Sequence, residues 1–423
     1  MSGPRVPRAA DVEEAAARLA GVVSRTPLTF SERLSVATGA RVLLKREDLQ
    51  PVRSYKLRGA YNFIAQLDDA ARAAGVMCAS AGNHGQGVAM SCRLLGIRGT
   101  VFVPATTPRQ KIGRMQALGG RWLDLRIVGD TYDDAAGVAA AEAAANGATL
   151  VPAFDAGPVI AGQGTVAREI LEQMDEPPDV LLVPVGGGGM LAGCVALLSE
   201  RAPGTRVVGV EPRGARSLGV AVESGAPVTL DHIDTFVDGA AVRRVGDLPF
   251  ATLAGHDVAL TTVTEGAVCQ EMLDLYQVDG VIAEPAGALA CAALDVPGRP
   301  GPVRVTEGQT VVAILSGGNN DVSRYGEIVE RALVHEGRKH HFMVNFPQEP
   351  GALRRFLDEV LGPTDDITLF EYVKRNNRET GPALVGIELA SADDLPALLD
   401  RMAHSPMLVE KLESDSQFYR FLI

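Results

Sequence analysis

The sequence predicts an α/β fold, and three observations support that prediction. Short β-rich runs alternate with Ala/Leu-rich helical stretches from about Arg41 onward. The β-rich runs are apolar nearly throughout, as is typical of parallel strands covered by helices on both faces. The alternation ends at a polar stretch near residue 336. We therefore expect a first domain of residues 1–335 and a second domain of residues 336–423.

The individual elements follow from these runs. In the first domain we expect strands at 75–79, 98–104, 179–185, 207–211 and 311–316, and helices at 109–118, 133–145 and 160–173. In the second we expect strands at 342–346, 367–374, 383–389 and 408–412, with helices at 351–361 and 392–402. The resulting order, βαββαβ, is that of the ferredoxin-like unit.

Composition excludes several classes of function. The 423 residues are 46% hydrophobic and carry a net charge of -12, which argues against nucleic acid or an anionic membrane as a partner. Five scattered cysteines without a C-x-x-C pair argue against a disulfide framework or a structural zinc site. Residues 180–198 are uncharged over a membrane-spanning length, but Pro184 and four glycines divide them into a strand and a helix. Residues 1–8 contain no apolar run, so we expect no signal peptide and a cytoplasmic enzyme.

Two segments at expected helix starts carry candidate chemistry. Lys56 lies in S-Y-K-L-R-G-A (residues 54–60), although a lone lysine is most often a surface residue. Ser80, Ala81, Gly82, Asn83 and His84 begin S-A-G-N-H-G-Q-G, directly after an expected strand. Such a turn can present several backbone N–H groups to an anion. It can equally be an ordinary capped turn, in which His84 is structural.

Two further segments follow apolar strands. Gly186, Gly187, Gly188, Gly189 and Met190 come after the expected strand 179–185, and their N–H groups could hold a phosphate. The same glycines partly match a dinucleotide fingerprint, with Glu211 placed as a ribose-binding acid, so a nicotinamide oxidoreductase is an alternative. Ser316, in S-G-G-N-N, ends another strand, where a hydroxyl can bond a ring nitrogen.

Taken in order, these four segments resemble the fold-type II pyridoxal-phosphate family, whose catalytic domain is tryptophan-synthase-β-like, and the resemblance implies a first domain of two lobes. T-P-L (26–28), K-R-E-D-L-Q (45–50), G-V-E-P (209–212) and E-P-A-G-A (284–288) are similar to threonine dehydratases and serine racemases. The segments F-P-Q-E-P-G-A-L (346–353) and F-E-Y (370–372) resemble the ACT-like regulatory domain of biosynthetic threonine dehydratases. The resemblance covers nearly the whole chain.

The resemblance implies a role for each segment. Pyridoxal 5'-phosphate is the implied cofactor, with Lys56 bound to it covalently, Asn83 bonded to its ring oxygen and Ser316 facing its ring nitrogen. Gly186 to Met190 are implied to hold the phosphate, and the amides of residues 80–84 the substrate carboxylate. The implied reaction is that of a threonine ammonia-lyase: L-threonine gives 2-oxobutanoate and ammonia in isoleucine synthesis.

Two departures separate the chain from the serine racemases it resembles. Ala81 stands where those enzymes carry a serine that acts as the opposite-face base, and Ser217 stands where they carry a metal-binding aspartate. We therefore expect no metal site. A serine dehydratase or racemase stays the alternative within the family, and an amino-acid sensor without activity is a third alternative. The resemblance further implies a homotetramer and inhibition by isoleucine, which we expect to bind near residues 347–351.

Overall fold

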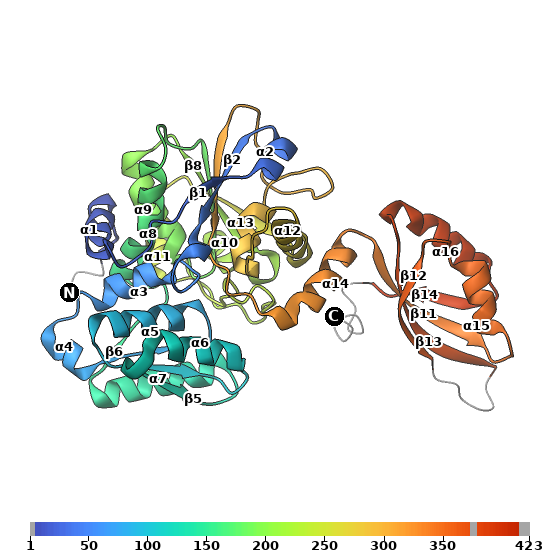
Figure 1. The fold of residues 1–423 in the computed structure, drawn as a ribbon, viewed down its shortest axis with the longest axis horizontal. Helices are drawn as coiled ribbons and strands as arrows, with labels where there is room; N and C mark the ends of the chain where they lie inside the picture. The colour runs from blue at the N-terminus through green and yellow to red at the C-terminus, as the bar shows by residue number, and fades with distance from the viewer. Residues whose placement is uncertain (1–4, 373–378, 414–423) are drawn as a thin grey trace. The chain divides into compact units, whose positions relative to one another are not determined.

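The computed structural model describes residues 5–372 and 379–413 (Figure 1). They form two compact units, Met1–Asp321 and Val322–Ile423. The predicted α/β class is confirmed, because the first unit contains two mainly parallel sheets covered by helices. Helix α14 (Tyr325–His335) belongs to the second unit. The domain boundary expected at residue 336 stays a prediction.

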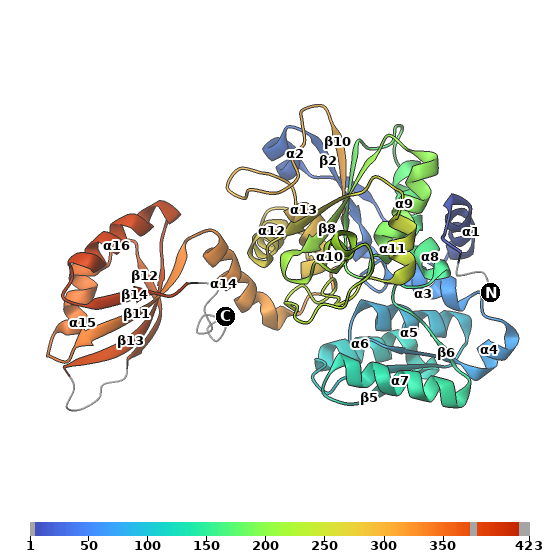
Figure 2. The same cartoon turned by 180° about the vertical axis from the view of Figure 1, so that it is seen from behind.

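The larger lobe of the first unit is a six-stranded sheet in the order β1-β2-β10-β7-β8-β9. Its neighbours are parallel, except that β1 runs antiparallel to β2. Helices α8 (Gly157–Glu172) and α9 (Gly189–Arg201) lie on one side of this sheet, and α12 (Glu265–Gln277) and α13 (Pro285–Ala292) lie on the other (Figures 1 and 2). The strands are β1 (Leu28–Phe30), β2 (Arg41–Arg46), β7 (Val180–Pro184), β8 (Arg206–Pro212), β9 (Ala259–Val263) and β10 (Thr310–Leu315).

The smaller lobe is a four-stranded parallel sheet in the order β5-β4-β3-β6. Side chains of β3 alternate between its faces: Val76 and Cys78 pack in the core under α5 and α6, whereas Met77 packs against α7. This period of two is what a strand covered on both faces requires. The strands are β3 (Val76–Ala79), β4 (Gly99–Val103), β5 (Leu123–Ile127) and β6 (Thr149–Leu150).

Helices of both lobes largely fill the stretches expected from the sequence. The uncharged stretch 180–198 forms β7 and the separate helix α9, as predicted, and no described helix is long and apolar enough to cross a membrane. The longer helices of the unit are α1 (Ala9–Leu19), α3 (Lys56–Ile64), α5 (Asn83–Leu95), α6 (Arg109–Gly119), α7 (Tyr132–Asn146), α8 (Gly157–Glu172), α9 (Gly189–Arg201), α10 (Ser217–Ser224), α12 (Glu265–Gln277) and α13 (Pro285–Ala292).

The second unit has an antiparallel sheet in the order β12-β13-β11-β14, which is the predicted ferredoxin-like topology. It has its own core, in which Phe346 meets Phe356 and Phe370 edge to face. The helix expected at 351–361 is a short α-helix continued by a π-helical turn, and residues 373 and 374 of an expected strand lie outside the described residues. The elements are β11 (Lys339–Pro347), α15 (Ala352–Arg355), the π-turn (Phe356–Val360), β12 (Asp366–Tyr372), β13 (Thr380–Glu388), α16 (Leu395–His404) and β14 (Leu408–Lys411).

Candidate active site

Lys56 is the first residue of helix α3, in the first unit. Its Nζ donates to the carbonyl of Ala153 at 3.3 Å and lies 5.1 Å from the centre of the Tyr55 ring. Helix α3 packs closely on α8 through glycines: a Cβ on Gly162 would come within 2.7 Å of the Arg58 carbonyl oxygen. The backbone that carries Lys56 is therefore held at short range by α8.

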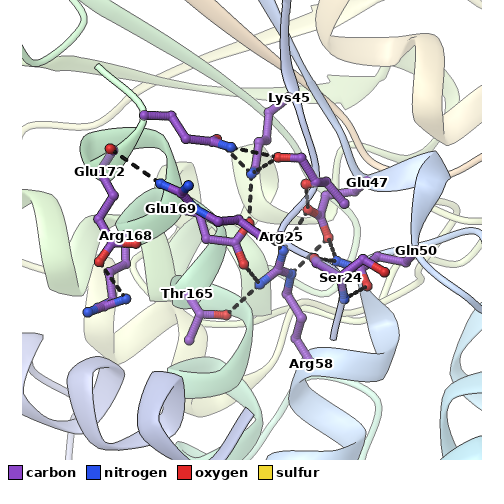
Figure 3. Close-up of polar contacts among 12 residues, drawn as sticks. Ser24, Arg25, Lys45, Glu47, Gln50, Arg58, Thr165, Arg168, Glu169 and Glu172 are labelled. Carbon is purple, nitrogen blue, oxygen red and sulfur yellow. Dashed lines mark hydrogen bonds and ion pairs between the residues drawn. The ribbon is translucent and has the colours of Figure 1, made fainter. Parts of the chain in front are cut away.

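A cluster of buried charges fixes the first turn of α3 (Figure 3). Arg58 donates two hydrogen bonds of 2.8 Å to the Glu47 carboxylate and bonds of 2.7 and 3.0 Å to the two oxygens of Glu169. Lys45 donates to Glu169 at 2.7 Å and to the carbonyl of Thr26 at 2.8 Å. We call these four charged residues (Lys45, Glu47, Arg58 and Glu169) the Arg58 cluster.

The Arg58 cluster is electrically balanced, because it contains two cations and two carboxylates. Burial alone would raise the pKa of Glu47, but the charge and hydrogen bonds of Arg58 overcome that effect and lower it. Burial lowers the pKa of Lys45. A buried group of charges with its bonds satisfied holds its elements in one arrangement, here β2, α3 and α8.

Residues 80–84 lie where strand β3 turns into helix α5. Gly82 is the N-cap of α5, and the first N–H groups of a helix have no acceptor within it. Together with Lys56 these residues line a cavity of about 730 Å³. An anion in this cavity would meet both the helix N-terminus and the lysine.

His84 is held in a structural role. It is buried, and its Nε2 lies 2.9 Å from the carbonyl oxygen of Val151, so Nε2 carries the proton in this contact. Burial, followed by the nearby charge of Lys56, lowers the pKa of His84 to about 4. The imidazole is therefore neutral at physiological pH and ties α5 to the end of β6.

The four glycines between β7 and α9 are required by close contacts. A Cβ on Gly187 would lie 2.2 Å from the Phe154 ring, and one on Gly186 would lie 2.9 Å from the Cα of Ala240. Gly188 has φ +85, which L side chains rarely adopt. The loop, with Met190 and Lys56, lines a second cavity of about 80 Å³ at the N-terminus of α9.

All four predicted segments thus meet, because Lys56 lines both cavities and Asn319, of the S-G-G-N-N segment, lines the larger one. Ser316 differs: it is buried after β10 and is not among the residues lining either cavity. Its Oγ donates to the Ala286 carbonyl at 3.1 Å, and its own carbonyl accepts from the Tyr55 N–H at 3.2 Å. The segment therefore contacts the residue that precedes the lysine.

The structure adds three residues that sequence reasoning had given no role. Phe154 lines both cavities, and Glu284 and Asn319 line the larger one. Glu284 belongs to the E-P-A-G-A segment and Asn319 to S-G-G-N-N, so both stood in segments already marked by the resemblance. A charged residue directly before an apolar helix was the available signal for Glu284.

These surroundings fit pyridoxal phosphate. The glycine loop and helix N-terminus form a site for a phosphate, the lysine can bind an aldehyde, and the adjoining cavity has room for a ring and an amino acid. Gly186 to Met190, Lys56 and Asn83 are the residues that would hold the group.

The alternative cofactor, a dinucleotide, would lack its ribose-binding acid in this structure. The carboxylate of Glu211, the candidate ribose ligand, is buried and accepts the N–H groups of Leu218 and Gly219 at 2.7 and 2.9 Å. Glu211 therefore caps helix α10, and it is not among the residues that line the two cavities.

Comparison with known proteins agrees with this chemistry. Residues 19–317 match the family described as pyridoxal-phosphate dependent enzyme, so the first unit is a fold-type II catalytic domain. Residues 330–422 match the C-terminal regulatory domain of threonine dehydratase. The chain belongs to the family of biosynthetic L-threonine dehydratases.

Individual relatives support that membership. The biosynthetic L-threonine dehydratase IlvA of Mycobacterium tuberculosis is 60% identical over 98% of this chain and 96% of its own length. Among solved structures, the processed form of threonine deaminase isoform 2 from Solanum lycopersicum is 34% identical with a TM-score of 0.70, covering 78% of this chain and 95% of that one. Maize serine racemase is 28% identical with a TM-score of 0.70, covering 78% and 99%.

Proposed function

We propose that this protein is a pyridoxal-phosphate-dependent threonine ammonia-lyase that converts L-threonine to 2-oxobutanoate and ammonia. The observation that carries the proposal is the meeting of Lys56, the residue 80–84 turn and the glycine loop around two cavities that share the lysine. The identity of 60% to a biosynthetic L-threonine dehydratase over 98% of the chain supports this choice of substrate.

Each group has a role in that reaction. The cofactor, when bound, withdraws electrons from the substrate's α-carbon. Lys56 holds the cofactor and, once free, takes the proton from the α-carbon of threonine. The N–H groups at the start of α5 bind the substrate carboxylate, and the glycine loop holds the cofactor phosphate. Asn83 orients the cofactor, and Ser316 is proposed to face its ring nitrogen.

A spectrum and a substrate panel test this function. The purified protein should be yellow, and it should release an oxo acid from L-threonine faster than from L-serine. A methyl group changes such discrimination by only about 10–200-fold, so both rates should be measurable. A colourless protein that does not turn yellow on addition of pyridoxal phosphate would contradict the proposal.

Serine racemization is the second candidate, because maize serine racemase shares the fold at 28% identity. Ala81 has no group that could protonate the opposite face of the α-carbon. We expect no D-serine after long incubation with L-serine, measured by chiral chromatography. D-serine formed at a rate comparable to pyruvate would favour the racemase.

We further propose that the second unit binds isoleucine and thereby weakens the use of threonine. The described residues that line the two cavities belong to the first unit. Gly351, at φ +92, starts the helical segment after the loop 347–351, where we expect the ligand. We propose a homotetramer as the assembly.

Two truncated chains separate regulation from folding. One ends after Val334, near the proposed domain boundary, and the other ends after Asp321, where the first compact unit ends. Either should keep threonine turnover, whereas isoleucine should change the affinity for threonine by about 5–150-fold in the full chain only. A full chain blind to isoleucine, or a truncated chain still inhibited, would contradict this. The truncation that is more soluble also locates the boundary.

A further inference from the structure

Asn83 is held by two other side chains of the larger cavity. Its Nδ2 donates to Glu284 Oε1 at 2.6 Å, and its Oδ1 accepts from Asn319 Nδ2 at 2.7 Å. The backbone N–H of Asn319 donates to the other carboxylate oxygen of Glu284 at 3.2 Å. We call these three residues (Asn83, Glu284 and Asn319) the Asn83 cluster.

The partners of this cluster leave its two amides only one orientation. In its ionised form the Glu284 carboxylate only accepts hydrogen bonds, so the Asn83 nitrogen then faces Glu284. Asn319 Nδ2 also donates to the Val52 carbonyl at 2.8 Å, so its nitrogen is fixed as well and its second N–H must face the Asn83 oxygen. Asn83 therefore keeps one N–H without a partner in the cluster.

Glu284 itself is held tightly against the chain. It is buried at the N-cap of helix α13, and a Cβ on Gly317 would come within 2.2 Å of its Oε1. Gly317 is the first glycine of S-G-G-N, so this contact explains a residue of that motif. The salt bridge of Lys111 with Asp238, at 2.8 Å, is formed by two other residues that line the same cavity.

We propose that Glu284 is a positioning residue that fixes the Asn83 amide with its remaining N–H available to the ring oxygen of the cofactor. Glu284 acts through Asn83 and has no contact with the substrate in this role. Asn319 supports the same orientation from the other end of the amide. This inference rests on the proposed function, because it assumes that pyridoxal phosphate occupies the cavity.

Glu284→Gln tests the proposal without a change of size. A glutamine has one accepting oxygen and one donating NH₂ group, so its NH₂ faces either the Asn319 N–H or the Asn83 NH₂. The Asn83 amide then loses its single orientation. In the holoenzyme we expect a changed visible absorption band, a shift in the pH at which that band titrates, and a fall of about 10²-fold in kcat at little change in KM.

Glu211→Gln is the matched control. Glu211 is also a buried glutamate that accepts two backbone N–H groups, but it caps α10 outside the cavities. Its holoenzyme should keep the wild-type band, and kcat within about twofold. The same spectral change in both variants would mean general loosening of the fold and would overturn the proposal, as would a wild-type band and kcat in E284Q.

Asn319→Ala keeps the question decidable if E284Q does not fold. It removes one of the two bonds that orient the Asn83 amide and leaves the bond to the carboxylate, so the band should shift, though by less than in E284Q, and kcat should fall by less. An unchanged band in N319A together with unfolded E284Q would overturn the proposal. Wild-type protein is measured first, and if it shows no visible band with the cofactor, the proposed function has failed. If the wild type shows the band and the variants have the same band and kcat, this inference alone has failed.

Discussion

The Arg58 cluster and the Asn83 cluster are both buried and polar, yet their surroundings differ. The Arg58 cluster joins β2, α3 and α8 with charges that balance, and none of its four members is among the residues lining the two cavities. The Asn83 cluster has all three members in the wall of the larger cavity and one N–H without a partner inside the cluster. We call the Arg58 cluster closed, because its members bond to one another and line neither cavity, and the Asn83 cluster open, because it keeps an N–H for a ligand in the cavity. The closed cluster stabilises the fold, whereas the open one can bind a ligand.

Burial and a raised pKa do not by themselves distinguish a carboxylate at a ligand site from one that only stabilises the fold. Burial raises the pKa of Glu284 to about 7, and burial raises that of Glu211 to about 7 as well. Of the two, Glu284 lines the larger cavity, and Glu211 is not among the residues that line the two cavities. A perturbed carboxylate becomes a functional candidate when it also lines a cavity and orients a group that faces it.

The largest effect is expected for Lys56→Ala, because this change removes the lysine that we propose binds the cofactor and takes the α-proton. Turnover should fall by at least about 10³-fold, since no other residue can take over the lysine's covalent and proton-transfer roles. Borohydride reduction of the wild-type holoenzyme followed by peptide mapping should label Lys56 alone. Label on another lysine would show that the site is assigned wrongly.

The closed cluster should respond to substitution by losing stability. Arg58→Met leaves Glu47 without its main partner and the cluster with an unbalanced charge, which should cost about 3–5 kcal/mol of unfolding free energy. This loss is measured by urea unfolding, with the absorbance of the bound cofactor as the signal that reports on the first unit.

Arg168→Met is the control, because Arg168 lies on the same helix as Glu169 but makes partly exposed pairs, with Glu13 of α1 and Glu172 of α8. That loss should be about 0–1 kcal/mol. Equal losses for the two arginines would remove the distinction between a closed cluster and ordinary surface pairs.

Sequence reasoning reached the segments but not the connections between them. Lys56, Asn83 and the four glycines stand in local patterns of small residues at strand ends, so their positions could be predicted. The pairings of Arg58 with Glu169 and of Asn83 with Glu284 join residues 111 and 201 positions apart, and no local pattern specifies them. The sequence carries little trace of the Arg58 cluster, because Lys45 is followed by three charged residues and Glu169 directly follows Arg168.

The fold was predictable to a similar depth. The alternation of apolar strands and helices predicted parallel sheets, and the βαββαβ order predicted the antiparallel sheet of the second unit. The π-helical turn Phe356–Val360 was not predictable, because a helical period in sequence does not distinguish an extra residue in one turn.

A smaller effect is expected from the titration of Glu211. Its pKa is raised from 4.5 to about 7 in the folded protein, so the folded state binds the proton more tightly than the unfolded chain. Stability from this group is therefore complete below its unfolded pKa and is lost as pH rises towards about 7. Glu211→Gln should remove a pH-dependent loss of about 3 kcal/mol between about pH 5 and pH 8. The unfolding free energy is measured as a function of pH for the wild type and E211Q. The same pH dependence in both proteins would contradict the raised pKa.

The smallest effect, none, is expected from removal of divalent metal. A metal ion at Glu211 would have to replace the two N–H groups that its carboxylate already accepts, from Leu218 and Gly219. Ser217 offers a hydroxyl where a second carboxylate would be needed, and no cluster of three metal-binding side chains exists among residues 5–372 and 379–413. Hard cations bind sites with several oxygens, so a capped carboxylate beside a lone hydroxyl is a weak ligand set. Threonine turnover before and after treatment with a chelator should agree. A large loss of turnover that magnesium restores would show that Glu211 exchanges its capping bonds for a metal. The contrast between Glu211, whose bonds are complete, and Glu284, which orients a group that faces the cavity, would then not hold.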